Sequence, residues 1–256
     1  MAPAFSVFEG YLVAYRRTWR SSVFASFLLP LLFVVGFGLS VGGYVDARGS
    51  LGSVRYLDYI VPGLLASNAM QMGYAESAYP VMGRFQWLGS YHAMAATPLR
   101  IVDILAGDLL FVVFRVLTST AVFLAVASAL GGVHSAWAVL VPFACVLLAL
   151  AFATPGAAFT ASIERDSHFA LVQRFLVVPL SLFSGVFFPI AALPVALRFL
   201  AYASPLWHAV QLCRAATLPG FGLTPLAAAG HAGYLALWVG VGFWLALARF
   251  RHRLTR

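Results

Sequence analysis

Six long apolar stretches recur along the sequence and constrain the fold of this chain more than any other feature. Each has about the 20 residues that a helix needs to cross a hydrocarbon core roughly 30 Å thick. The chain is also 62% hydrophobic and only 9% charged, far from the balance of soluble domains. The sequence therefore predicts an all-α polytopic membrane protein with six transmembrane helices, at about residues 22–41, 58–80, 103–130, 136–160, 170–190 and 231–249.

The first apolar stretch has a cleavable signal peptide as its alternative interpretation. The apolar part of a signal peptide spans about 7 to 15 residues, whereas 22–41 is longer and leads into Gly-Gly-Tyr. We therefore interpret it as the first span. No repeat, low-complexity tract or linker divides the sequence, so residues 1–256 are expected to form a single domain.

The basic residues are all Arg, because the sequence contains no Lys. A Walker-type phosphate loop and a pyridoxal phosphate Schiff base both require a Lys amine. We therefore expect no ATPase site and no cofactor in this chain, so that any ATP that drives it binds to another chain. Cys145 and Cys213 offer neither a disulfide framework nor a metal spacing. The net charge of +8 points to lipid headgroups rather than to nucleic acid.

The distribution of Arg residues sets the expected orientation. With the N-terminus in the cytoplasm, 11 of the 16 Arg residues lie on the cytoplasmic side, 4 lie outside and Arg115 lies within a span. Six spans then return the C-terminus to the cytoplasm. An Arg-only basic set with abundant Ala, Gly and Pro also suggests a GC-rich bacterial genome. We expect a multi-pass protein of the bacterial inner membrane with both termini cytoplasmic.

Residues 1–21 are expected to form an amphipathic helix in the cytoplasmic headgroup plane. Polar residues such as Glu9 and Arg16 lie away from an apolar and aromatic stripe that recurs every three or four residues. The stripe consists of Phe5, Phe8, Leu12, Tyr15 and Trp19. The alternative is a signal-anchor flank whose aromatic residues lie at the membrane–water interface.

Residues 81–100 form the longest predicted cytoplasmic connection. Phe85, Leu88 and His92 recur at helical spacing, and Thr97-Pro98 is a break that ends a short helix before the third span. Large rigid side chains commonly fill grooves on a partner protein. The pattern therefore predicts a coupling helix for a cytoplasmic subunit. A membrane-surface hairpin without a partner is the alternative.

Polar residues in the second and third spans are candidates for a substrate path. One face of the second span carries Asn68, Gln71 and Glu76, and the third span carries Asp108 and Arg115. Polar groups are costly in hydrocarbon, so these residues should face the protein interior or a cavity. Arg115 either forms a structural pair with Asp108 or Glu76, or binds an anionic headgroup.

Residues 184–214 contain apolar stretches that Gly and Pro break every few residues, each too short to cross a bilayer. Such broken backbone is tolerated at membrane depth only where protein or water satisfies it. We expect a re-entrant pair of half-helices on the outer side, between the fifth and sixth spans. A plain extracytoplasmic loop is the alternative, although loops are seldom this hydrophobic.

Four motifs, in this order on a six-span frame, resemble those of the membrane permeases of ABC-2 type exporters. The resemblance covers essentially the whole chain and is strongest to the branch that includes nodulation lipo-oligosaccharide and daunorubicin-type antibiotic-resistance exporters. The motifs are Tyr59-Ile-Val-Pro-Gly-Leu-Leu, Gly83-Arg-Phe-Gln-Trp through Ala96-Thr-Pro-Leu, Ser184-Gly-Val-Phe-Phe-Pro, and Ser204-Pro-Leu-Trp-His with Arg214.

The resemblance implies a permease that pairs with a second permease copy, identical or a sister chain, and with two ATP-binding subunits that hold ATP and Mg. It implies outward movement of an amphipathic substrate such as a lipid-linked glycan, a glycolipid or a hydrophobic drug. Contact with the ATPase is then expected at Arg84, Phe85, Gln86, Trp87, Leu88 and His92, and the re-entrant hairpin at Gly185, Phe187, Phe188, Pro189, Pro205, His208 and Arg214. Residues 82–100 lack the acidic residues common in such segments, so aromatic packing is expected to carry this contact.

Two other classes of function are alternatives to export. A gradient-driven secondary transporter would use Glu76, Asp108 and Arg115 as a relay, but no inverted repeats with matched broken helices are visible. An intramembrane enzyme would need a catalytic or metal motif, and the nearest candidate is Glu164 with His168, two ligands without a third. Neither pattern is as specific as the export motifs.

Overall fold

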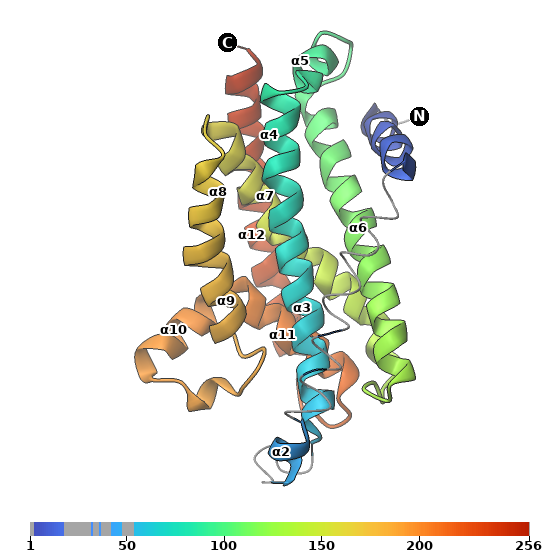
Figure 1. Ribbon diagram of the computed structural model, residues 1–256, viewed down its shortest axis with the longest axis vertical. Coiled ribbons are helices and arrows are strands. Elements are labelled where there is room, and N and C mark those ends of the chain that lie inside the picture. The colour runs from blue at the N-terminus through green and yellow to red at the C-terminus, as the bar shows by residue number, and fades with distance from the viewer. Residues whose placement is uncertain (1–2, 18–31, 33–35, 37–41, 48–53, 256) are drawn as a thin grey trace.

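A computed structural model describes residues 3–17, 32, 36, 42–47 and 54–255, and every regular element among them is helical. The four longest helices lie side by side along the long axis (Figure 1). The elements are α2 (Gly42–Ala47), α3 (Tyr56–Ser77), α4 (Tyr79–Gln86), α5 (Ser90–Ala95), α6 (Ile101–Ala129), η2 (Ala136–Leu140), α7 (Val141–Ser162), α8 (Ser167–Val172), η3 (Gln173–Val177), α9 (Val178–Phe183), η4 (Ile190–Ala192), α10 (Val195–Ala203), α11 (Pro205–Thr217) and α12 (Pro225–Leu254).

Three of these helical segments are long and apolar enough to cross a membrane. They are α6 with 29 residues, η2 continued by α7 with 27, and α12 with 30, with mean hydropathies of 2.3, 2.5 and 1.4. Since about 20 residues suffice for a span, all three have length to spare. They confirm the third, fourth and sixth predicted stretches as helices of spanning length, and the chain as a membrane protein.

The other three predicted spans have different outcomes. The first, 22–41, lies outside the described residues apart from 32 and 36. The second corresponds to α3, a 22-residue helix that is less apolar because it carries Asp58, Asn68 and Glu76. The fifth corresponds to α8, η3 and α9, which form 17 helical residues with one π-helical turn at Gln173–Val177.

The fifth helix ends earlier than predicted. The sequence pattern placed its end near residue 190, but α9 ends at Phe183. Gly185 follows with φ of +79°, in the left-handed region that glycine adopts without steric cost and that an α-helix excludes. The apolar residues up to 190 therefore belong to the turn that leads into η4 and α10.

Helix α7 occupies the centre of the bundle, where it packs against α3, α6, α11 and α12. Its buried positions are mostly small, with Ala149, Ala151 and Ala153 fully enclosed. Gly73 of α3 lies against this face so closely that a Cβ there would be 2.2 Å from the carbonyl oxygen of Ala149. Small residues thus let the two backbones touch, as is common between membrane helices.

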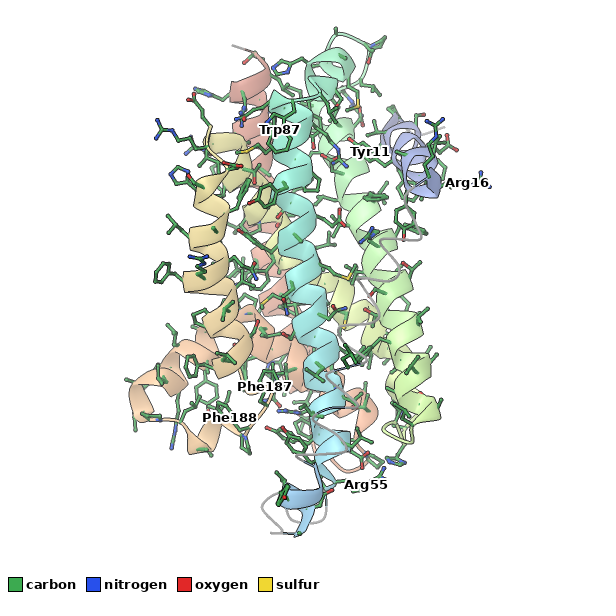
Figure 2. The ribbon with its side chains drawn as sticks, viewed as in Figure 1. Tyr11, Arg16, Arg55, Trp87, Phe187 and Phe188 are labelled. Carbon is green, nitrogen blue, oxygen red and sulfur yellow. The ribbon has the colours of Figure 1, made fainter. Side chains whose placement is uncertain are left out.

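The two ends of the bundle carry different elements. Both ends of the chain and α5 lie toward one end, and α2 and α10 lie toward the other (Figure 1). Figure 2 shows Trp87 at the α5 end and Arg55, Phe187 and Phe188 toward the opposite end. Residues 81–100 and 184–214, which the sequence predicts on opposite sides of the membrane, therefore lie at opposite ends of the structure.

The N-terminal segment is helical over residues 3–17. Two residues of its aromatic stripe face α6, with the Phe8 ring 6.1 Å from Phe114 and the Tyr15 ring 5.9 Å from Phe111, whereas Phe5 is 43% exposed. Glu9 and Arg16 are exposed. Residues 18–21, including Trp19, lie outside the described residues.

Candidate functional site

A buried ion pair joins α4 to α6 near the α5 end of the bundle. The Nη1 atom of Arg84 lies 2.7 Å from Oδ1 of Asp108, and their side chains are 14% and 6% exposed. The phenol of Tyr91 in α5 donates a hydrogen bond to Oδ2 of the same carboxylate. The Arg84 guanidinium also lies 4.0 Å above the Tyr11 ring of the N-terminal helix. Four segments therefore meet at this one pair.

A second ion pair joins α3 to α6 next to the first. An Nη2 atom of Arg115 lies 3.4 Å from Oε1 of Glu76, and both side chains are mostly buried. The Arg115 guanidinium also faces the Tyr15 ring, 5.1 Å from its centre. Of the partners that the sequence left open for Arg115, the structure places Glu76 beside it, whereas Asp108 pairs with Arg84.

The two pairs balance two cations with two carboxylates in the bundle interior. A small cavity between them is lined by Glu76, Arg84 and Asp108 together with apolar residues of α6 and α7. A buried charge without its partner is strongly destabilising, so each member depends on the others. Tyr11 and Tyr15 cover the two Arg side chains, and cation–π contacts thereby attach the N-terminal helix to the bundle.

The phenols of Tyr11 and Tyr91 are held in their protonated form. Burial, followed by the negative charge of Asp108, raises the pKa of Tyr91 well above its usual value. The same two causes raise the pKa of Tyr11. Since the ordinary pKa of Tyr is about 10, both groups remain neutral near pH 7, and Tyr91 remains a hydrogen-bond donor to Asp108.

The predicted coupling residues divide into two sets. Phe85 is only 4% exposed and packs on Tyr91 and Phe250, with ring centres 4.6 and 4.9 Å away. Arg84, in the ion pair above, also points inward. The outward-facing set is exposed, with Trp87 at 62% and Leu88 at 76%, and consists of Gln86, Trp87, Leu88 and His92. These four exposed residues are therefore the ones that can contact a partner protein.

The remaining polar residues of α3 lie at different depths. Asn68 donates to Oγ of Ser119 in α6 over 3.3 Å, so it faces the interior. Gln71 is exposed at the side of the helix. The polar face of α3 is therefore directed at α6 along Asn68 and Glu76, with Gln71 at its edge.

At the opposite end, Arg214 of α11 fastens the turn that follows α9. Its Nη2 atom donates to the carbonyl oxygen of Gly185 over 2.6 Å, and its guanidinium lies 3.7 Å from the centre of the Tyr59 ring. Arg214 is only 4% exposed. The hydroxyls of Ser184 and Ser204 are hydrogen-bonded at 2.9 Å, which ties the turn to the start of α11. The motif residues of 184–214 are thus joined to one another and to α3.

A comparison with known protein families covers the two ion pairs and the motif residues described above. The sequence model of the ABC-2 type transporter family matches residues 5–218. This chain belongs to the ABC-2 type transporter family. It is therefore a membrane-embedded component of a transport system, in a family whose permeases carry no ATPase domain of their own and imply an ATP-binding partner.

Curated relatives of this ABC-2 permease match over nearly their whole length. Nodulation protein J of Rhizobium leguminosarum bv. trifolii is 30% identical, covering 96% of this chain and 94% of the relative. Nodulation protein J of R. leguminosarum bv. viciae is 31% identical, covering 96% and 95%. The inner membrane transport permease YadH of Escherichia coli K12 is 25% identical, covering 80% and 79%.

The remaining predicted residues of the permease lie near α10 and α11. Pro205 is the first residue of α11 and is buried, whereas Pro189 is exposed before η4. His208 stacks on Tyr234 at 4.0 Å and has its Nδ1 atom 2.8 Å from Nδ1 of His231. Burial, followed by the neighbouring His231, lowers the pKa of His208 to about 4. His208 is thus a neutral packing residue between α11 and α12.

Several functional contacts of the permease had no signal in the sequence. The partners of Tyr11 and Arg253 lie far along the chain, and Tyr91 binds Asp108 across the break between α5 and α6, so no spacing pattern connects these positions. Glu164 precedes α8, so it does not share a helix face with His168. Among the residues that the structure describes, no group of three or more potential ligands is arranged for a metal ion.

Proposed function

We propose that this chain is the permease subunit of an ATP-driven exporter that moves an amphipathic substrate out of the cytoplasm or inner leaflet. ATP and Mg bind to a separate subunit, which docks on the exposed side chains Trp87 and Leu88. The observation that carries this proposal is the construction of α4 and α5. The turn between these helices presents the two apolar side chains, while the inner surface of α4 and α5 is bound to α6 and α12.

The inner contacts make residues 81–100 suitable for transmitting force. Arg84 and Tyr91 bind Asp108 of α6, and Phe85 packs on Phe250 of α12. Helix α4 also continues from α3 with only Ala78 between them. Because all these contacts are buried, movement of an ATPase bound at Trp87 would displace α3, α6 and α12 together, as rigid-body transitions require.

The wider architecture is part of the same proposal. Six spans would place residues 1–21 in the cytoplasmic headgroup plane, residues 81–100 in the cytoplasm and residues 184–214 as a re-entrant region on the outer side. Both termini would then be cytoplasmic, in a bacterial inner membrane. The location of both termini toward the α5 end supports this arrangement (Figure 1). A complete transporter would contain two permease copies and two ATP-binding subunits.

The proposed substrate class rests on the interior chemistry of the permease and on its relatives. The interior charges Glu76, Arg84, Asp108 and Arg115 are paired with one another, and 15% of the chain is aromatic. An amphipathic molecule suits such surroundings better than a free ion. The relatives named for nodulation support a lipid-linked glycan or glycolipid, with a hydrophobic drug as the other member of the class.

The test is gentle purification of the tagged permease from its native membrane. We expect a Walker-type ATPase to copurify with the wild type and to be lost from a Trp87→Ala, Leu88→Ala double variant. Trp137→Ala is the matched control, since Trp137 is 69% exposed at the start of the segment η2. The proposal fails if no ATPase copurifies in several mild detergents and the reconstituted protein instead transports on an ion gradient.

A further inference from the structure

A second, larger cavity lies at the α5 end of the bundle, between the ends of α7 and α12. It has a volume of about 250 Å³ and is lined by Ser162, Glu164, Arg249, His252 and Arg253, among others. By the same measure, one bound water needs only about 10–15 Å³. The cavity therefore has room for a polar group much larger than a water molecule.

One wall of this cavity is fixed by Arg253. Its Nη1 atom donates to the carbonyl oxygens of Thr160 and Ile163, at 3.0 and 3.1 Å. Its guanidinium also lies 4.5 Å from the centre of the Phe85 ring. Arg253 thus caps the end of α7, and its position does not depend on a ligand.

The other basic residues of the cavity, Arg249 and His252, are available to bind a ligand. The side chain of Arg249, one helical turn before Arg253, forms no ion pair or hydrogen bond with the residues that the structure describes. His252 lies beside it, and Glu164 is the single acidic residue of the lining. The cavity therefore has a positive balance of charge and an unused guanidinium.

The length of α7 places the cavity at the depth expected for lipid headgroups. Helix α7 has 22 residues, which at about 1.5 Å per residue makes it roughly 33 Å long, close to the thickness of the hydrocarbon core. Its end at Ser162 therefore lies near a membrane boundary. Helix α12, with 30 residues, is long enough to carry Arg249 and Arg253 to the same level.

We propose that this cavity binds a phosphate group, with Arg249 as the principal ligand, His252 beside it and Arg253 as the fixed wall. A guanidinium offers two parallel N–H donors that match two phosphate oxygens. At headgroup depth the expected source is an anionic phospholipid, and soluble phosphate shares the same chemistry. The bound group would connect the last turns of α12 to the linker after α7.

The test measures phosphatidylglycerol retained by the purified full-length chain, using native mass spectrometry. Arg249→Gln should lower retention about tenfold or more, as expected for loss of a hydrogen bond between charged groups. Arg251→Gln is the matched control, because Arg251 is exposed like Arg249 but does not line the cavity. Unchanged gel-filtration behaviour and lipid-free melting temperature establish that both variants fold.

Four outcomes are distinguished. Selective loss of phosphatidylglycerol from Arg249→Gln supports a lipid phosphate. If inorganic phosphate instead raises the melting temperature of the delipidated wild type but not of Arg249→Gln, the phosphate group is soluble. Equal retention of phosphatidylglycerol by Arg249→Gln and Arg251→Gln, with no effect of inorganic phosphate, overturns the proposal. If Arg249→Gln loses a copurifying ATPase but no lipid, the proposal is also overturned, and the cavity binds an acidic side chain of that subunit.

Discussion

Arg84 and Asp108 lie 2.7 Å apart in the interior of the bundle and join the proposed coupling segment to α6. Both side chains are almost enclosed, and Tyr91 and Tyr11 complete the surroundings. A pair in this position does more than attach two helices. It makes the end of α6 respond to anything that moves α4.

The first prediction concerns loss of one member of this pair. Arg84→Met should destabilise the permease by about 3–5 kcal/mol, because the Asp108 carboxylate is left buried without its cation. The double variant Arg84→Met, Asp108→Leu should be more stable than Arg84→Met, since no unpaired charge remains. Thermal unfolding in detergent measures both.

The control variant for these unfolding measurements is Arg100→Met. Arg100 also pairs with an acidic residue of α6, Asp103, but its side chain is 77% exposed. Its loss should change the melting temperature little, as for other exposed ion pairs. Equal destabilisation by Arg84→Met and Arg100→Met would show that burial of the Arg84 pair is unimportant.

The second prediction is an alkaline loss of stability that depends on Tyr91. The pKa of Tyr91 is raised in the folded state, so its contribution is fully present below the ordinary pKa of about 10 and is lost as the pH rises toward the folded value. Tyr91→Phe should therefore flatten the fall in melting temperature above pH 10. An unchanged alkaline profile in Tyr91→Phe would count against the buried hydrogen bond to Asp108.

The third prediction concerns the other end of the bundle and acidic pH. The pKa of His208 falls from about 6.5 to about 4 on folding, chiefly by burial, so its stabilising effect is present above pH 6.5 and is lost as the pH falls toward 4. His208→Gln should reduce the loss of melting temperature between these values. Parallel curves for His208→Gln and the wild type would contradict this account.

The fourth prediction tests the direct contact between the backbones of α3 and α7. Gly73→Ala should destabilise the protein by about 1–3 kcal/mol, because the new methyl group would overlap the Ala149 carbonyl. Gly240→Ala in α12 is the control, since a Cβ there has no atom within 4 Å, and it should be neutral or slightly stabilising. The two melting temperatures are compared directly.

Much of the fold follows from hydropathy and helix-breaking residues. The apolar stretches predicted α6, α7 and α12, and Thr97-Pro98 separates α5 from α6 as expected. The end of α9 was misplaced because the residues after Gly185 are as apolar as a span, and hydropathy does not register a left-handed backbone. Composition identifies burial but does not locate every turn.

The site was predictable only in part, for a physical reason. Polar residues are conspicuous in apolar stretches because they are costly to bury, so the sequence identifies Glu76, Asp108 and Arg115 as candidate site residues. Which carboxylate pairs with which Arg depends on helix rotation, and sequence spacing within one helix does not determine it. The inward direction of Phe85 likewise depends on Phe250 of α12, a residue remote in the sequence.

The central claim is that an ATPase docks on the exposed turn between α4 and α5. The most direct measurement is photo-crosslinking from position 88, with a benzophenone amino acid in place of Leu88, which is 76% exposed. The account predicts a crosslink to an ATP-binding subunit from position 88 and none from position 137. A crosslink from position 137 but not from 88, or only lipid adducts at both positions, would contradict it.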